Sequence, residues 1–126
     1  MKYSKATDYA LHTVLFLARS SSEKKLGVQE LAEKQKVSPT YLSKILNKLV
    51  KEGIIHSSPG VNGGYSLSPH WEKISFLDII QGIEGKTSLF DCCLNSNPEC
   101  SIKKVMLAAE KNMEEELRTI KISDLV

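Results

Sequence analysis

The sequence lacks the short motifs that common enzyme classes need. It has no Gly-x-x-x-x-Gly-Lys-Ser/Thr loop to bind nucleotide phosphates and no His-Glu-x-x-His zinc pair. It has no Gly-x-Ser-x-Gly nucleophile elbow, and its glycines never show the Gly-x-Gly-x-x-Gly spacing of dinucleotide-binding folds. We therefore predict that the protein is not an enzyme.

Long apolar runs and a secretory signal are also missing. Residues 1–5 lead into an amphipathic pattern, and no stretch is apolar for long enough to span a bilayer. We expect a cytoplasmic protein with no membrane partner. In that reducing compartment an odd count of three cysteines does not indicate a disulfide framework. It favours metal or redox chemistry, or cysteines without a role.

The 126 residues, 41% of them hydrophobic, are enough for one compact domain with an appended helix. The charge is unevenly distributed. Residues 1–70 hold ten Lys/Arg and five Asp/Glu, a net +5, whereas residues 71–126 hold seven and ten, a net −3, which together give the overall +2. A basic first part and an acidic second part suggest that only the first meets a polyanion, although chance could produce a difference of this size.

The segment 38–53 has a full set of helix signals. Ser38 can cap the first free amides, Pro39 suits the first helical position, and Gly53 suits a left-handed end. One face is apolar, and the other has hydroxyls, an amide and lysines without any acid. The apolar face comprises Leu42, Ile45, Leu46, Leu49 and Val50, and the polar face comprises Thr40, Ser43, Lys44, Asn47, Lys48 and Lys51. Hydroxyls followed by lysines suit a helix inserted end-first into a DNA major groove.

The flanking segments support this interpretation. Residues 28–36 predict a short helix, and a tight turn joins it to the next one, which is the helix-turn-helix pattern. Residues 54–58 and 65–68 predict two strands joined by the glycine-rich tip 59–64, a β-hairpin that would form a wing. An ordinary amphipathic core helix would explain the segment 38–53 alone, but not this order of elements. The predicted fold is mainly α with a small β-hairpin wing, a winged helix-turn-helix.

The second part predicts a dimerisation element. We expect a first helix over 3–19, a short helix over 76–83, a loop over 87–99 and a long helix over 101–119. The long helix has one narrow apolar seam, made of Ile102, Val105, Met106, Ala109, Met113, Leu117 and Ile120. Such a seam favours a helix pair between two subunits, the alternative being packing against its own domain. A homodimer would read a pseudo-palindromic double-stranded DNA operator.

Taken together, these segments resemble the winged-helix transcription regulators that include IscR, NsrR, RirA and CymR, over essentially the whole chain. The resemblance rests on residues 3–10, 38–46, 49–55, 63–67 and 122–125. It implies a DNA-binding domain over 1–70, and an effector loop and dimerisation helix over 71–126. With the helix pattern above, it predicts these DNA-binding residues: Ser38, Thr40, Tyr41, Ser43, Lys44, Lys48, Asn62, Gly63, Gly64 and Tyr65. Family members often have Arg-Gly at the wing entrance, where this chain has Pro59-Gly60, so a minor-groove arginine is missing.

The resemblance also gives the cysteines a context, because cluster-binding members have three in the effector loop. Cys92 and Cys100 match the first and last, but the middle one is absent, and Cys93 is adjacent to Cys92. A cluster would also need a fourth ligand, for which Asp8 or Glu30 of another subunit could supply oxygen.

Three interpretations of these cysteines stay open. In the first, which we favour, Cys100 at a helix N-terminus has a lowered pKa and forms a disulfide with Cys92 or Cys93, or a sulfenic acid. This thiol switch would make the protein a regulator of redox or nitrosative stress, most simply a repressor. In the second, Cys92 and Cys100 hold an iron–sulfur cluster. In the third, the cysteines are inert. A winged helix used for protein–protein contact is a further alternative, which the acid-free face disfavours.

Overall fold

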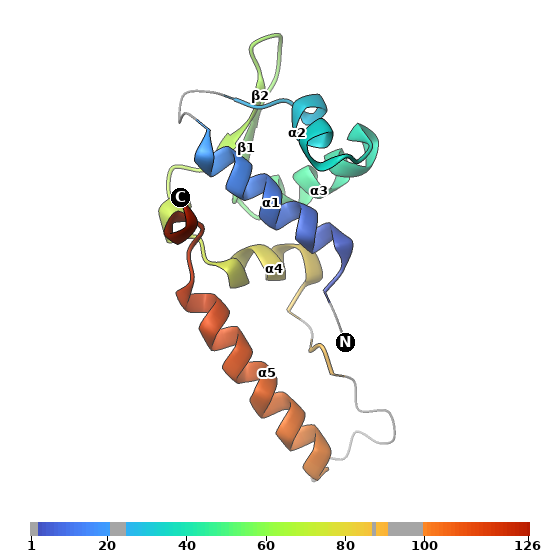
Figure 1. The fold of residues 1–126 in the computed structure, drawn as a ribbon, viewed down its shortest axis with the longest axis vertical. Helices are drawn as coiled ribbons and strands as arrows, with labels where there is room; N and C mark the ends of the chain where they lie inside the picture. Colours follow the sequence, from blue (N-terminus) through green and yellow to red (C-terminus); the bar gives the residue numbers. More distant parts are fainter. Residues whose placement is uncertain (1–2, 21–24, 87, 91–99) are drawn as a thin grey trace.

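The computed structural model describes residues 3–20, 25–86, 88–90 and 100–126. The helices and strands in this part are α1 (Lys5–Arg19), α2 (Val28–Gln35), α3 (Pro39–Lys51), β1 (Ile55–Ser58), β2 (Gly64–Leu67), α4 (Phe76–Glu84) and α5 (Ser101–Thr119). Two short 3-10 turns, at Trp71–Lys73 and Ile122–Leu125, complete them. The prediction of a mainly α fold with one β-hairpin is confirmed (Figure 1).

The turn between α2 and α3 forms as the sequence predicts. Helix α2 ends at Gln35, one residue before the expected end, because Lys36 adopts a left-handed conformation with φ of 56°. The side chain of Ser38 accepts a hydrogen bond from the amide of Tyr41 at 3.1 Å and so caps α3. Gly53 has φ of 74°, which confirms the predicted left-handed residue after α3.

The apolar face of α3 lies at the centre of the core. Leu42, Leu46 and Leu49 have no exposed surface, and they pack with buried residues of α1, α2 and α4. The same core cluster includes Ile74 and Ile122, which lie beyond residue 70. The division of the chain at residue 70 is therefore a functional proposal, and the hydrophobic core is continuous across it.

The hairpin is attached to the core at its base. β1 and β2 pair antiparallel, with Ile55 opposite Leu67 and Ser58 opposite Gly64. Leu26, between α1 and α2, exchanges two backbone hydrogen bonds with Tyr65, at 3.0 and 2.7 Å. A Cβ at Gly64 would lie 2.9 Å from the carbonyl oxygen of Leu26, so the absence of a side chain at Gly64 allows this close pairing.

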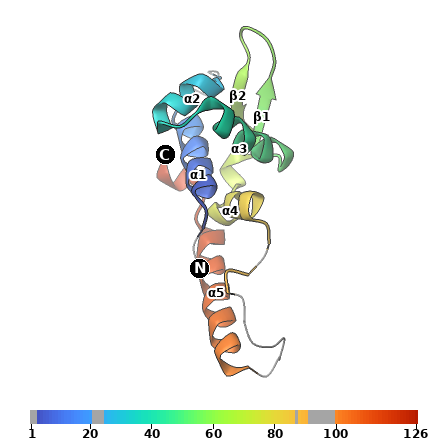
Figure 2. The ribbon, with the colours of Figure 1, turned by 90° about the vertical axis from the view of Figure 1, so that its right-hand side faces the viewer.

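Helix α5 extends away from the rest of the molecule (Figures 1 and 2). Its range, 101–119, agrees with the sequence prediction, and none of its residues is buried. The chain returns to the core after α5, where the amide of Phe76 donates to the carbonyl of Ile120 at 2.8 Å and Ile122 is buried. One end of α5 is thus anchored, and the other projects beyond α4.

Candidate nucleic-acid interface

The outer face of α3 is exposed and basic. Thr40, Lys44 and Lys48 are exposed together with Asn47 and Lys51, and Ser43 is half-buried. No acidic residue lies among them, and the opposite face of the helix is fixed in the core. Rigid support on one side and positive charge on the other are what a helix needs in order to enter a DNA groove.

The hydroxyl groups of α3 differ in what they can still do. The Ser38 oxygen accepts the capping hydrogen bond, so its remaining role toward DNA is mainly that of a donor. The Ser43 hydroxyl donates to the carbonyl of Thr40 at 2.8 Å, which leaves the Ser43 oxygen as an acceptor for base amino groups. Ser38 therefore has a structural role beside its predicted DNA contact.

Tyr41 links the start of α3 to α1. Its side chain is 40% exposed, and its ring meets the ring of Tyr9 edge-to-face, with centroids 5.8 Å apart and planes at 84°. Aromatic pairs of this geometry contribute about 0.5–1.5 kcal/mol beyond their burial. Tyr41 therefore helps to orient the N-terminus of α3, and its exposed part remains a candidate DNA contact.

The wing residues that we predicted from the sequence fall into two groups. Asn62 is exposed in the turn between the strands. Gly63, Gly64 and Tyr65 are only partly exposed, and each has a role in the fold. A Cβ at Gly63 would lie 2.1 Å from the carbonyl oxygen of Ser58, and Tyr65 packs against the core. These structural roles alone are enough to account for the two glycines and the tyrosine at these positions. Their contact with DNA therefore stays a prediction.

Sequence reasoning missed Val61, whose side chain is fully exposed in the same turn. A lone apolar residue in a glycine-rich loop gives no periodic signal, so only its position in the folded hairpin draws attention to it.

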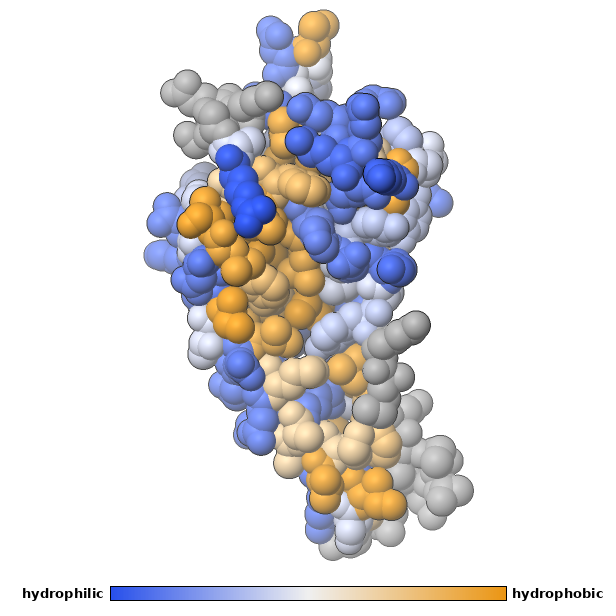
Figure 3. All heavy atoms as spheres, in the orientation of Figure 1, coloured by the Kyte–Doolittle hydropathy of each residue, from blue (hydrophilic) through white to orange (hydrophobic). Residues whose placement is uncertain are grey.

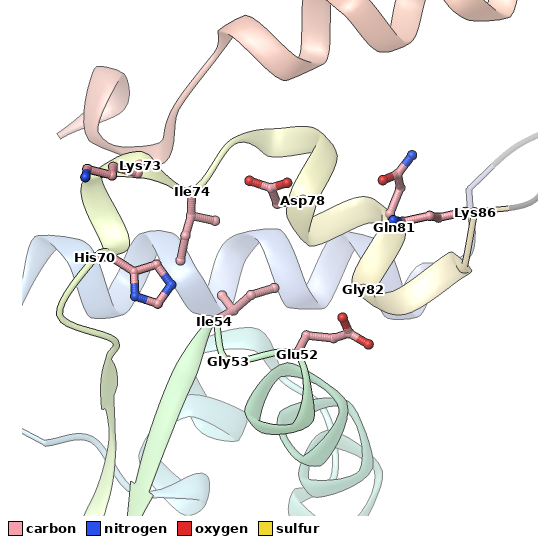
Figure 4. A pocket seen from close by; sticks show the side chains of 10 residues that line it. All are labelled: Glu52, Gly53, Ile54, His70, Lys73, Ile74, Asp78, Gln81, Gly82 and Lys86. Atoms are coloured by element: carbon pink, nitrogen blue, oxygen red, sulfur yellow. The ribbon is translucent and has the colours of Figure 1, made fainter.

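A groove lies where the end of α3 meets α4 and the 3-10 turn at Trp71–Lys73 (Figure 4). It has a volume of about 280 Å³ and an apolar base that includes Ile54 and Ile74. Two carboxylates and two lysines line it, so its formal charge is zero with the histidine neutral. These charged residues are Glu52, Asp78, Lys73 and Lys86, with His70. Because the groove has no excess of positive charge, it does not extend the basic face of α3.

The predicted sensing residues are only partly within the described structure. Cys92 and Cys93 lie outside the described residues. Cys100 is half-buried at the N-cap of α5, as predicted, and its carbonyl accepts from the amide of Lys104 at 3.1 Å. In α1, the Oδ1 atom of Asp8 lies 3.3 Å from the Nδ1 atom of His12, and both side chains are exposed. Within the described part of the chain, no three His, Cys, Asp or Glu side chains gather as a metal site.

Residues 88–90 are attached to α5. The carboxylate of Glu110 accepts hydrogen bonds from the amide of Leu89 and the hydroxyl of Ser88, both at 2.6 Å. An apolar hollow of about 240 Å³ lies beside this contact, lined by Leu89, Phe90, Met106, Ala109, Glu110 and Met113. Residues 88–90, near the start of the predicted loop 87–99, and Cys100, directly after it, thus both lie on or next to α5.

A helix-turn-helix with an exposed basic face, followed directly by a β-hairpin, defines a winged-helix DNA-binding protein. No helix in the described ranges combines the length and apolar character needed to cross a membrane. The sequence pattern of the Rrf2 family, described as an iron-dependent transcriptional regulator, matches residues 3–126. The chain belongs to this family, which confirms the predicted resemblance.

Individual relatives agree with this assignment. A stretch of 90 residues, 71% of the chain, is 41% identical to YffB of Lactococcus lactis, of which it covers 58%. The chain thus spans little more than half of that relative. The whole chain aligns with the transcriptional regulator NsrR of Shouchella clausii, with 29% identity over 133 aligned positions, and the alignment covers 89% of that protein. The structure of CymR of Bacillus subtilis superposes with a TM-score of 0.84 at 25% identity, covering 99% of this chain and 95% of CymR. These proteins are regulators, in agreement with the prediction that this chain is not an enzyme.

Proposed function

We propose that the chain acts in the cytoplasm as a homodimeric repressor that binds a pseudo-palindromic double-stranded DNA operator. The observation that carries the proposal is the exposed, acid-free face of α3 beside the wing. In this arrangement Thr40 and Ser43 contact base edges, and Lys44 and Lys48 contact phosphates.

The exposed end of α5 supports the dimer. Ile102 and Val105 are 68% and 67% exposed, although both belong to the apolar seam. Met113 and Leu117, toward the other end of the seam, are half-buried. Figure 3 shows apolar residues on this face near α1 and again at the projecting end of α5. A second copy of α5 would cover the projecting end and place two α3 helices on one DNA molecule.

DNA binding is best tested by separating affinity from sequence preference. An operator is first selected from random DNA with the wild-type protein, and dissociation constants are then measured by fluorescence anisotropy at several salt concentrations. Lys44→Ala or Lys48→Ala should weaken binding to all sequences and reduce the salt slope by about one. The double variant Thr40→Ala/Ser43→Ala should keep the salt slope and lose discrimination between operator and mutated sites.

The exposed Lys111 of α5 provides the matched control, since Lys111→Ala removes a charge far from α3. An unchanged operator preference in the double variant would refute the assignment of base contacts to Thr40 and Ser43. If the wild-type protein showed no salt-dependent DNA binding at all, the wing and α3 would instead serve protein–protein contact.

For the signal we propose a thiol switch, in which Cys100 is oxidised by a peroxide-class oxidant. When Cys100 forms a disulfide with Cys92 or Cys93, the two thiols give up two protons and two electrons. The peroxide accepts them, its O–O bond breaks, and it becomes two waters, or one water and one alcohol if it is an organic peroxide. The position of Cys100 at the start of α5 supports the proposal, because a new bond there would move the dimerisation helix and change the spacing of the two α3 helices.

An iron–sulfur cluster is the second candidate, favoured by the description of the family as iron-dependent. Cysteine thiolates are suitable ligands for iron, and Cys100 with Cys92 would hold the cluster. A bound cluster would supply a centre that reacts with oxidants or nitric oxide. Iron, acid-labile sulfide and visible absorption of protein purified without oxygen decide between the two: stoichiometric iron and sulfide favour the cluster, and colourless, iron-free protein favours the thiol switch.

A further inference from the structure

The apex of the wing presents a single apolar side chain. The amide of Gly63 donates to the carbonyl of Gly60 at 3.0 Å, which closes a turn with Val61 and Asn62 at its two central positions. Val61 has a relative exposure of 103%, the highest among the exposed large apolar residues of the described chain. The hairpin projects past the helices at the end of the molecule that includes α2 and α3 (Figure 2). Val61 and Asn62 thus occupy the two central positions of the turn at the tip of the hairpin.

The wing has almost no charge. Residues 54–69 include no Lys, Arg, Asp or Glu, and their one histidine is His56, opposite Ser66 in the hairpin. Unlike α3, the wing therefore has no lysine or arginine that could bind a phosphate. It also has none that the negative potential of a narrow minor groove would attract. Proteins that enter the minor groove read it with Arg, Lys, Asn or Gln and frequently insert apolar wedges, and of these groups the tip of this wing has Asn62 and Val61.

The apex is also held in a defined shape. A Cβ at Gly63 would lie 2.1 Å from the carbonyl oxygen of Ser58, so the chain turns back on itself very closely. The base of the hairpin is fixed by the two hydrogen bonds between Leu26 and Tyr65. Valine itself is branched at Cβ and has few rotamers. An apolar group that is rigid before binding loses little conformational entropy when it is buried.

We propose that Val61 is a specificity-determining residue that enters the minor groove beside the α3 contact and packs on sugars and base edges. Asn62 hydrogen-bonds the groove floor next to it. The inference rests on the proposed DNA-reading function. It implies a wing that contributes affinity with little salt dependence and that prefers flexible pyrimidine–purine steps, which open at a lower energy for an apolar wedge.

Three variants test this on the full chain with the selected operator. Val61→Ala removes two methyl groups and should weaken binding about tenfold, with an unchanged salt slope. Val61→Arg should bind the operator more tightly than Val61→Ala does, and its salt slope should exceed that of the wild type by about one. The control is Val126→Ala, which shortens a valine that is 60% exposed in the last residue of the chain, and it should change nothing.

The preference for flexible steps gives a second measurement. 2-Aminopurine at the pyrimidine–purine step beside the α3 contact should brighten on binding of the wild type, because unstacking restores its emission, and should stay dim with Val61→Ala. Wild-type affinity and full brightening in Val61→Ala would overturn the inference. If Lys44→Ala weakens binding while Val61→Ala does not, the wing inference alone fails, whereas absence of salt-dependent DNA binding by the wild type would remove the proposed function itself.

Discussion

The hydroxyl of Thr7 in α1 donates a 2.5 Å hydrogen bond to the Oε2 atom of Glu84, the last residue of α4. The same oxygen accepts from the amide and the hydroxyl of Ser4, at 2.7 and 2.8 Å. Thr7 is only 2% exposed, so the carboxylate provides the partner that a buried hydroxyl requires. This contact joins α1 to the last turn of α4, and the chain continues from α4 toward the cysteines.

The contact predicts a specific dependence of stability on pH. Burial alone would raise the pKa of Glu84, but hydrogen bonds from Thr7 and Ser4 and the charge of Lys48 together hold it below its ordinary value of 4.5. The folded state therefore binds fewer protons than the unfolded state in this range. The stabilisation is complete above pH 4.5 and is lost as the pH falls through the folded-state pKa.

Glu84→Gln should therefore reduce the loss of stability between pH 7 and pH 4, as measured by urea unfolding at one fixed protein concentration. Glu84→Ala should cost about 1–3 kcal/mol at pH 7, because the hydroxyl of Thr7 loses its partner. Glu33→Gln, which changes an exposed carboxylate of α2, is the control. Identical pH profiles for the wild type and Glu84→Gln would show that this carboxylate does not contribute.

The attachment of the wing predicts a large effect for one glycine and a small effect for another. Gly64 has φ of 141°, and its Cβ position lies 2.9 Å from the backbone of Leu26, so Gly64→Ala should destabilise the protein by about 1–3 kcal/mol. Gly27, the N-cap of α2, has open space around its Cβ position and φ of −83°, so Gly27→Ala should cost less. Urea unfolding of both variants gives the comparison, and equal losses would contradict the proposed role of the Gly64–Leu26 contact.

The helix-turn-helix could be predicted from the sequence because its signals are local. The cap at Ser38, the apolar period along α3 and the left-handed Gly53 all lie within one stretch of chain, and the structure confirms each. The bounds of α5 agree for the same reason. The relations that position the site are not local: Glu84 meets Ser4 across 80 positions, and Gly64 meets Leu26 through the backbone.

The apolar seam of α5 shows where periodicity stops being informative. The pattern places Ile102, Val105, Met113 and Leu117 on one stripe, and it does not show which of them the protein's own fold will cover. The structure divides them, with Met113 and Leu117 half-buried and Ile102 and Val105 exposed. That division depends on tertiary contacts, which the periodicity of a single helix does not encode.

The exposed end of α5 predicts that one substitution will separate the subunits. Val105→Glu places a charge in the proposed interface, where it would be buried without a partner, and should convert a dimer into a monomer. Sedimentation velocity would measure this, and binding to a full operator should fall toward the affinity for a half-site. Lys111 is exposed and lies outside the apolar seam, so Lys111→Glu introduces the same side chain away from the proposed interface and should leave the dimer intact. A dimeric Val105→Glu protein would place the interface elsewhere.

The position of Cys100 at the start of α5 predicts that this thiol is required for the response to oxidant. Since serine cannot be oxidised to a sulfenic acid or a disulfide, Cys100→Ser should bind the operator normally in the reduced state and should lose its response to peroxide. The measurement is a peroxide titration of operator affinity, with the redox state followed by intact mass. Cys92→Ser and Cys93→Ser serve as comparisons: loss of response in one of them identifies the disulfide partner, and a response in both indicates a sulfenic acid on Cys100. A full response in Cys100→Ser would remove this residue from the mechanism.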